Sequence, residues 1–306
     1  MRYALGRPPI EETVDPRDAS DLLYRFARTL KSLSEAPAAM CVAMSSALAP
    51  GVAIRALIFS PGFRDISGEK ATLFAVLDDG WIIVSGMGAV PSHVDRAPFA
   101  DTLSAELTSV LLFGQLKVDY ASAGGARSAV ITFNAVMERV YREAMRLVLD
   151  GAEGVAGAAA IADERLDGLL RNAPFKFRCA ARECRPPAQR VRVVRCWPAA
   201  MAGRFGWRQR ERAPQAMLML TDREVICVAE QPAHWWMQLI KATRYGYVAT
   251  FCPLARLKTW RIVADDEVAT LALVLGAPRG GATVIVELPR EEERAVAAVM
   301  EARAAA

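Results

Sequence analysis

The side chains best suited to binding chemistry lie in two short segments of the second half of the chain. The first segment, residues 204–212, interleaves guanidinium and aromatic groups, and its candidate binding residues are Arg204, Trp207, Arg208, Arg210 and Arg212. Arginine recognises phosphate and carboxylate through paired hydrogen bonds, and tryptophan stacks on ligands or lies at membrane interfaces. We therefore expect partner or anion binding here. The alternative is a hairpin whose aromatic residues pack inward while its arginines stay solvated.

The second segment, residues 231–245, joins two expected strands and has no counterpart of similar composition in the first half. Its candidate binding residues are His234, Trp235, Trp236, Lys241 and Arg244. Adjacent tryptophans are typical anchors of protein interfaces. The alternative is a short helix that packs on the second domain or into the junction between domains.

Catalytic chemistry has little support in the sequence. The chain has only two histidines, His93 and His234, so we expect no metal cluster, no cofactor and no catalytic triad. Paired aspartates such as Asp78 and Asp79 lie in expected turns, where Asp is favoured for local hydrogen bonding. An enzyme with an interdomain site that uses His234, Asp222 or a cysteine such as Cys252 is the alternative from another functional class.

Length and composition favour two globular domains in a soluble protein. The chain has 306 residues, of which 53% are hydrophobic and 24% charged. Its start lacks an apolar signal sequence, and the apolar stretch 38–49 is too short to span a bilayer. We expect a cytoplasmic protein, with peripheral attachment to the inner face of the membrane left open. Arginine outnumbers lysine by 32 to 6, a bias that suggests a bacterial source.

Basic residues are concentrated in one stretch although the net charge is only +4. Residues 163–212 contain thirteen Arg or Lys against five Asp or Glu. A solvated face explains this, and a surface for an anionic partner is the alternative. Nucleic-acid binding through residues 176–212 is a further alternative, which the balanced charge elsewhere disfavours.

The elements that must position these residues form a repeated pattern. Apolar runs broken by a polar turn occur at residues 71–85 and 216–229, and a Gly-Gly turn, a strand and a helix follow in each half. We expect strands at 52–59, 71–77, 81–85, near 99–107, 111–120, 128–133, 175–179, 190–197, 216–220, 225–229, 247–252, 257–263, 268–275 and 283–288. We expect helices at 15–35, 134–150 and 163–171 and another from Pro289.

The second half resembles the bacterial members of the pleckstrin-homology-like superfamily, including the GRAM and YokE-like groups. The residues that carry the resemblance are the hairpin LMLTDREVICVAE, the strands FCPLARLKTW and GGATVIVEL, and the helix PREEERAVAAVMEA, so that it covers roughly residues 189–302. In the first half the order is the same, but Asp78-Asp79-Gly80 replaces the Thr-Asp-Arg turn. A period of about 150 residues indicates two related domains rather than a solenoid.

The resemblance implies an α+β chain with two antiparallel barrels or bent sheets, each with a C-terminal capping helix. We expect an N-terminal helical segment at 1–36, a first domain at 50–151 and a second at 163–304. Superfamily members are mostly lipid-binding, peptide-binding and scaffolding domains, so the resemblance implies binding and no reaction. The partner is expected to be a protein segment or an anionic membrane surface, contacted mainly through the second domain. Neither half has a clean basic motif in its first hairpin loop, and a homo-dimer is left open, with the first domain as a structural or dimerising unit.

Overall fold

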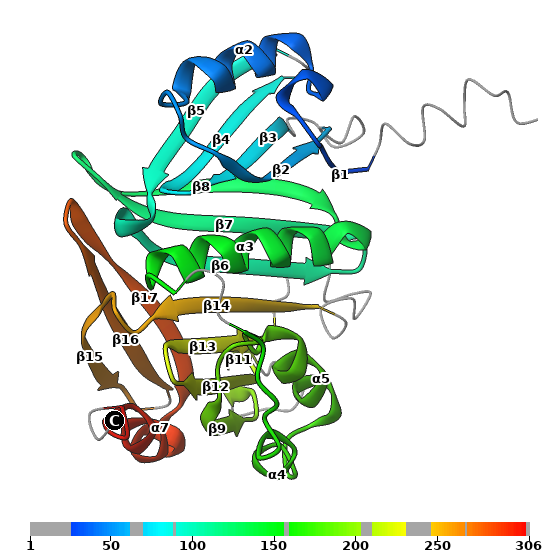
Figure 1. The fold of residues 1–306 in the computed structure, drawn as a ribbon. Helices are drawn as coiled ribbons and strands as arrows, with labels where there is room; N and C mark the ends of the chain where they lie inside the picture. The colour runs from blue at the N-terminus through cyan, green and yellow to red at the C-terminus, as the bar shows by residue number, and fades with distance from the viewer. Residues whose placement is uncertain are drawn as a thin grey trace, which may run out of the picture.

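The computed structural model describes residues 26–61, 70–87, 90–155, 159–202, 210–230, 246–266 and 268–303. The chain is an α+β structure of antiparallel sheets, as expected (Figure 1). In its first half the elements are β1 (Arg28–Thr29), η1 (Leu33–Glu35), α2 (Ala38–Ala47), β2 (Ile54–Ser60), β3 (Ala71–Leu77), β4 (Gly80–Met87), β5 (Val90–Pro98), η2 (Phe99–Asp101), β6 (Thr102–Val110), β7 (Phe113–Ser122), β8 (Gly125–Asn134), η3 (Ala135–Met137) and α3 (Glu138–Ala152).

The second half repeats this order of elements. It contains α4 (Leu166–Leu169), α5 (Phe175–Cys184), β9 (Val191–Trp197), β10 (Ala200–Ala202), β11 (Arg210–Ala213), β12 (Ala216–Thr221), β13 (Glu224–Ala229), β14 (Tyr247–Pro253), β15 (Leu257–Ala264), β16 (Val268–Ala277), β17 (Gly280–Pro289), η5 (Arg290–Glu292) and α7 (Glu293–Glu301). In its described part each half therefore has a helix of ten residues, α2 or α5, then seven main strands and a C-terminal helix. The short strand β1 is found in the first half, and the short helix α4 and the pair β10–β11 are found in the second.

The match between the halves extends to the register of single residues. Gly80 on β4 faces Pro98 at the end of β5, and Glu224 on β13 faces Pro253 at the end of β14. From this proline onward, matched positions keep a constant interval of 155 residues, as in the turn glycines Gly125 and Gly280. Both turn glycines have positive φ, +108° and +153°, which disfavours a side chain there. The repeated letters of the sequence thus correspond to a repeated backbone.

One sheet contains strands from both halves. Its order is β8-β7-β6-β14-β13-β12-β9, because β6 of the first half pairs with β14 of the second in antiparallel register, with Leu107 opposite Ala249. The remaining strands form the five-stranded sheet β1-β2-β3-β4-β5, the three-stranded sheet β15-β16-β17 and the pair β10-β11. Of the two expected forms, barrels or bent sheets, the barrels are wrong, because no barrel closes within the described part of the chain.

Three hydrophobic clusters fill the spaces between these layers. The largest lies between the five-stranded sheet, α3, α5 and one face of the seven-stranded sheet, and it contains residues of both halves. A second lies between β9, β12, β13 and β14 and the sheet β15-β16-β17 with α7, and a third lies under α2. Strands β3 and β12 are buried along their whole length because apolar layers cover both of their faces.

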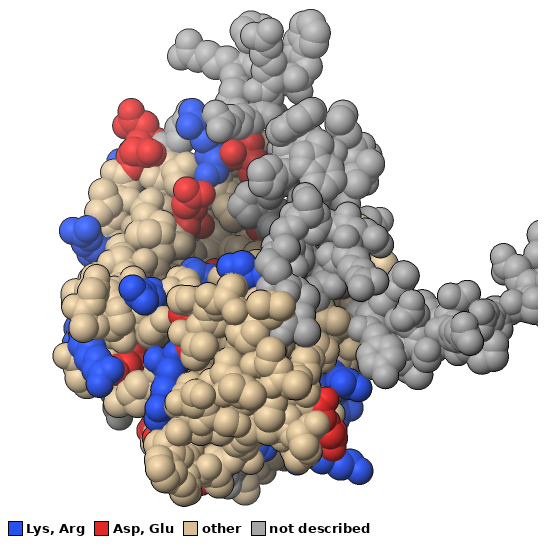
Figure 2. Space-filling view, turned by 90° about the horizontal axis from the view of Figure 1, so that it is seen from above, with Lys and Arg blue, Asp and Glu red and all other residues tan. Residues whose placement is uncertain are grey.

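Helix α2 covers the outer face of the five-stranded sheet through Met40 and Met44 and contains no charged residue. It lies at the top in Figure 1, and the view from above in Figure 2 shows an uncharged area there, with basic and acidic groups interspersed around it. Sequence analysis did not predict this helix or β5. The alanines of α2 are good helix formers, but its apolar residues run almost without interruption and so give no clear helical period.

Two predicted elements differ from the structure. The strand expected at 175–179 is the first half of helix α5, in which Phe177 is buried while Phe175 is 73% exposed. The buried residues of this segment have helical spacing and include Phe177, Ala181 and Cys184. The N-terminal helix expected at 15–35 is wrong where it can be described, since Arg28 and Thr29 pair with β2, and residues 15–25 lie outside the described part.

The shared sheet and shared core predict that the two halves unfold together. Loss of either half would expose the edge of β6 or β14 and part of the largest cluster, which is costly in water. We expect urea to give one transition, with coincident midpoints for far-UV circular dichroism and for the fluorescence of buried Trp81 and Trp197. Two separate transitions would contradict a shared sheet.

Candidate functional site

Most of the binding residues predicted from sequence lie outside the described part of the structure. These are Arg204, Trp207, Arg208, His234, Trp235, Trp236, Lys241 and Arg244. Arg210 is described only as a backbone position of β11, and Arg212 on the same strand is exposed. The structure therefore fixes where these two segments begin and end.

The short strands β10 and β11 form a ribbon that carries the first predicted segment. Ala202 pairs with Arg210, so residues 203–209 begin and end at the tip of the ribbon. Met201 on this ribbon is 52% exposed. Strand β11 also lies against β17, and Ala213 at its base is fully buried. The ribbon is therefore attached to the second half at its base.

Many basic residues of the stretch 163–212 are already engaged by neighbouring groups. Ion pairs join Arg182 to Asp167, Lys176 to Glu230, Arg192 to Asp222 and Arg195 to Glu292. Arg185 donates hydrogen bonds to backbone carbonyls, including that of Gln189 at 2.9 Å. These pairs support the interpretation of a solvated, paired face over a continuous cationic surface.

The residues of the enzymatic alternative are not brought together in the described structure. Burial raises the pKa of the Cys252 thiol, which disfavours the reactive thiolate. Burial alone would raise the pKa of Asp222, but hydrogen bonds from Arg192 and from the backbone N–H of Arg190 lower it. Asp222 is thus a turn residue that fixes β9, and His234 lies outside the described residues.

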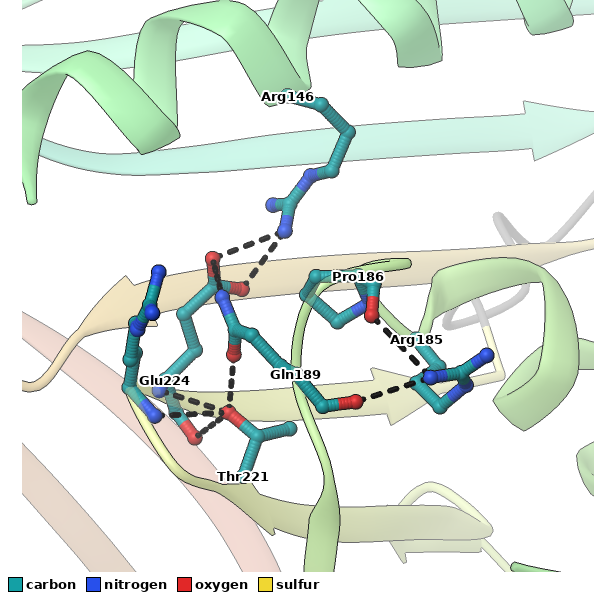
Figure 3. A network of polar contacts seen from close by, with 7 residues as sticks. Arg146, Arg185, Pro186, Gln189, Thr221 and Glu224 are labelled. Carbon is teal, nitrogen blue, oxygen red and sulfur yellow. Dashed lines mark hydrogen bonds and ion pairs between the residues drawn. The ribbon is translucent and has the colours of Figure 1, made fainter. Parts of the chain in front are cut away.

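The most developed polar network of the described structure lies where the two halves meet (Figure 3). Glu224, the first residue of β13, is fully buried, and Arg146 from α3 donates hydrogen bonds to its carboxylate oxygens at 2.8 and 3.0 Å. Gln189 donates a further hydrogen bond to the Glu224 carboxylate at 3.1 Å. The hydroxyl oxygen of Thr221 accepts a hydrogen bond from the backbone N–H of Glu224 at 2.8 Å. The guanidinium of Arg146 also lies 4.6 Å from the ring centre of Phe251. One buried ion pair thus joins the first half to the second.

A second acid lies beside this pair without a partner. Both carboxylate oxygens of Glu153, which follows α3, are buried and have no hydrogen-bond partner among the described residues. Burial, reinforced by the nearby charge of Glu224, raises the pKa of Glu153 to about 8, although Arg223 and Arg146 oppose the shift. Asp150, one turn earlier, also has a raised pKa, chiefly through burial. Glu153 is therefore mostly protonated at neutral pH.

Two arginines of the second half form hydrogen bonds or an ion pair with the first half. Arg256 donates hydrogen bonds to the carbonyls of Phe99, Thr102 and Ala152 at 3.0 to 3.1 Å, and so caps the end of α3. Arg279, in the turn between β16 and β17, lies 3.4 Å from the buried carboxylate of Asp101. We call the region where the two halves meet the seam. These contacts fix its geometry.

The opposite side of the seam is held by a cluster around Tyr247 of β14. Its hydroxyl lies 2.8 Å from Arg142, 3.0 Å from Glu138 and 3.2 Å from Glu183, so that α3, α5 and β14 meet at one point. In a smaller group on the first half, His93 and Tyr120 are both hydrogen-bonded to the carboxylate of Asp95. The sequence predicts neither group, because Tyr247 and Tyr120 meet their partners only through the pairing and packing of elements that are separate in the chain.

Breaking the buried pair from one side should be strongly destabilising. Arg146→Met leaves Glu224 buried without its cation, and we expect a loss of about 3–5 kcal/mol in the free energy of unfolding. The double variant Arg146→Met/Glu224→Gln should recover part of this loss, because no charge then stays buried. Urea denaturation measures both values. Arg139→Met removes an exposed helical pair and should cost less than about 0.5 kcal/mol, and equal losses at the two sites would contradict the role of burial.

The raised pKa of Glu153 predicts a pH-dependent stability. The folded protein holds this proton more tightly than the unfolded chain, so its contribution is present below the ordinary Glu pKa and is lost as pH rises toward 8. Glu153→Gln should therefore match the wild type in thermal midpoint near pH 4.5 and exceed it increasingly up to pH 8. Parallel curves for the two proteins across this range would show that Glu153 is not held protonated.

Comparison with known proteins assigns no family to this arrangement. No protein-family model and no curated protein sequence matches the chain. In the described part of the chain, no group of three or more His, Cys, Asp or Glu side chains is placed to hold a metal ion, and no helix is long and apolar enough to cross a membrane. Function is therefore argued from the residues and their geometry.

Proposed function

We propose that the protein is a non-catalytic binding module built from two pleckstrin-homology-like units. Its partner is a protein segment or an anionic membrane surface, which it contacts mainly through the second unit. Support for the fold assignment comes from the repeated order of seven strands and a C-terminal helix, together with the matched register of Pro98 and Pro253. A cytoplasmic protein that attaches peripherally to the inner face of the membrane fits this proposal.

The observation that carries the proposal is the ribbon β10–β11. In the second half, the connection between the first two main strands, β9 and β12, contains the two strands of the ribbon and the segment 203–209. In the first half, residues 62–69 of the corresponding connection lie outside the described part. Three arginines of the set flank or lie in this segment with Trp207, and Met201 adds exposed apolar surface at its stem. Cationic and apolar groups presented together favour an anionic surface with an apolar layer beneath it.

The buried polar groups and thiols in the rest of the described structure also support binding rather than catalysis. Buried polar groups elsewhere, such as Glu224 and Asp101, are engaged in contacts that hold the two halves together. Burial raises the pKa values of the Cys184, Cys227 and Cys252 thiols. These groups therefore stabilise the fold. Within the described part of the ribbon, Ala213 at its base is the residue that belongs to the core.

Vesicle binding tests the proposal directly. We expect the full chain to co-sediment with phosphatidylcholine vesicles that contain phosphatidylserine, and the bound fraction to fall as salt is raised because screening weakens surface charge attraction. Arg208→Gln/Arg210→Gln should lose about 1 kcal/mol of binding per removed charge, which is roughly fivefold each.

The matched control is Arg139→Gln/Arg290→Gln, which removes the same charge from exposed sites away from the ribbon. This variant should bind vesicles nearly as the wild type does. Binding to an acidic peptide such as poly-glutamate, but not to vesicles, would select the protein-segment version. Binding to neither probe, or equal loss in both variants, would contradict the ribbon as the binding surface.

A further inference from the structure

A cavity of about 330 Å³ opens on the first half at the seam between the two halves. This volume is at the lower end of the range for small-molecule sites. Its lining consists of Leu77, Asp79, Gly80, Trp81, Arg96, Ala97, Pro98 and Arg279. All but one of these residues belong to the β3–β4 turn and the neighbouring β4 and β5, and Arg279 reaches it from the β16–β17 turn of the second half. The cavity is therefore lined by both halves.

The two halves differ at one of the residues that line the cavity. Gly80 occupies the position that Glu224 holds in the second half, as the pairing with Pro98 and Pro253 shows. In the second half the Glu224 side chain fills this position and bonds to Arg146. At Gly80 a Cβ would lie 2.3 Å from the carbonyl oxygen of Ala97, so no side chain is accommodated there. The first half thus has no carboxylate at this position, and the cavity lies beside Gly80.

Two arginines and one aspartate, Asp79, are the charged residues in the lining of this space. Arg96 donates one hydrogen bond, to the carbonyl of Ala47 at the end of α2, and forms no ion pair within the described part of the chain. Arg279 keeps 62% of its side chain exposed beside Asp101. Two guanidinium groups from different halves therefore line one cavity, as Arg146 and its neighbours surround Glu224.

We propose that this cavity binds a small organic monocarboxylate, whose carboxylate group is bound by Arg96 and Arg279. The apolar part of the ligand lies toward Leu77 and Pro98. Asp79 in the lining and Asp101 behind Arg279 reduce the local positive charge, which favours a single negative charge over a phosphate dianion. Because Arg279 belongs to the second half, the ligand also strengthens the seam.

Benzoate is a suitable probe because it joins one carboxylate to a compact apolar ring. Titration of the full chain, followed by calorimetry, should give saturable binding with one site and a Kd of about 1 mM or below. Arg279→Gln and Arg96→Gln should each weaken binding by about tenfold, the loss expected for one charge-assisted hydrogen-bonding partner. Benzyl alcohol, which has a similar shape and no charge, should not bind.

Arg290→Gln is the matched control, because it removes one exposed arginine that pairs with Asp266 away from the cavity. Thermal unfolding identifies any variant that fails to fold, and Arg279→Lys should retain most of the binding if charge is what counts. Inorganic phosphate that binds more tightly than benzoate would overturn the ligand class. No saturable benzoate binding, or equal binding by Arg279→Gln and Arg290→Gln, would overturn the site itself.

Discussion

Backbone pairing between β6 and β14 is the constraint on which the rest of the structure depends. Each strand would otherwise be an exposed sheet edge, with unpaired N–H and carbonyl groups. The two strands pair Leu107 with Ala249 and Ala105 with Phe251. This pairing makes one sheet from β6, β7 and β8 of the first half and β9, β12, β13 and β14 of the second. The helix α3 lies against β6 of the first half, and the pairing of β6 with β14 brings it close enough to the second half for Arg146 to reach Glu224. Seam contacts and the seam cavity follow from this placement.

Sequence similarity between the halves accompanies a division of their roles. Equivalent positions have diverged where the halves meet: Gly80 matches Glu224, and Asp101 matches Arg256, which holds three carbonyls of the first half. Such pairs cannot be symmetric, because each half offers a different surface to the other. The additional ribbon in the second half lies away from these contacts.

Much of the fold could be predicted from local patterns, and the seam could not. The hairpins at 71–85 and 216–229 have apolar strands with polar turns, and Asn134 caps the turn before α3 through its side chain as its residue type suggests. Helix α5 was mistaken for a strand over 175–179 because local alternation cannot reveal which face is buried. Contacts such as Arg146 with Glu224 join residues 78 positions apart, and only the strand pairing defines them. The candidate binding segments were chosen by composition, which predicts chemistry but not position.

Interstrand nuclear Overhauser effects test the central claim most directly. A shared sheet predicts backbone proton contacts between residues 105–109 and 247–251, with Leu107 opposite Ala249. Contacts between β6 and β7 and between β13 and β14 belong to the separate halves and serve as internal controls. Observation of all three sets would support the account. Presence of both control sets without the β6–β14 set would show that the halves form separate sheets, and the proposed seam would be contradicted.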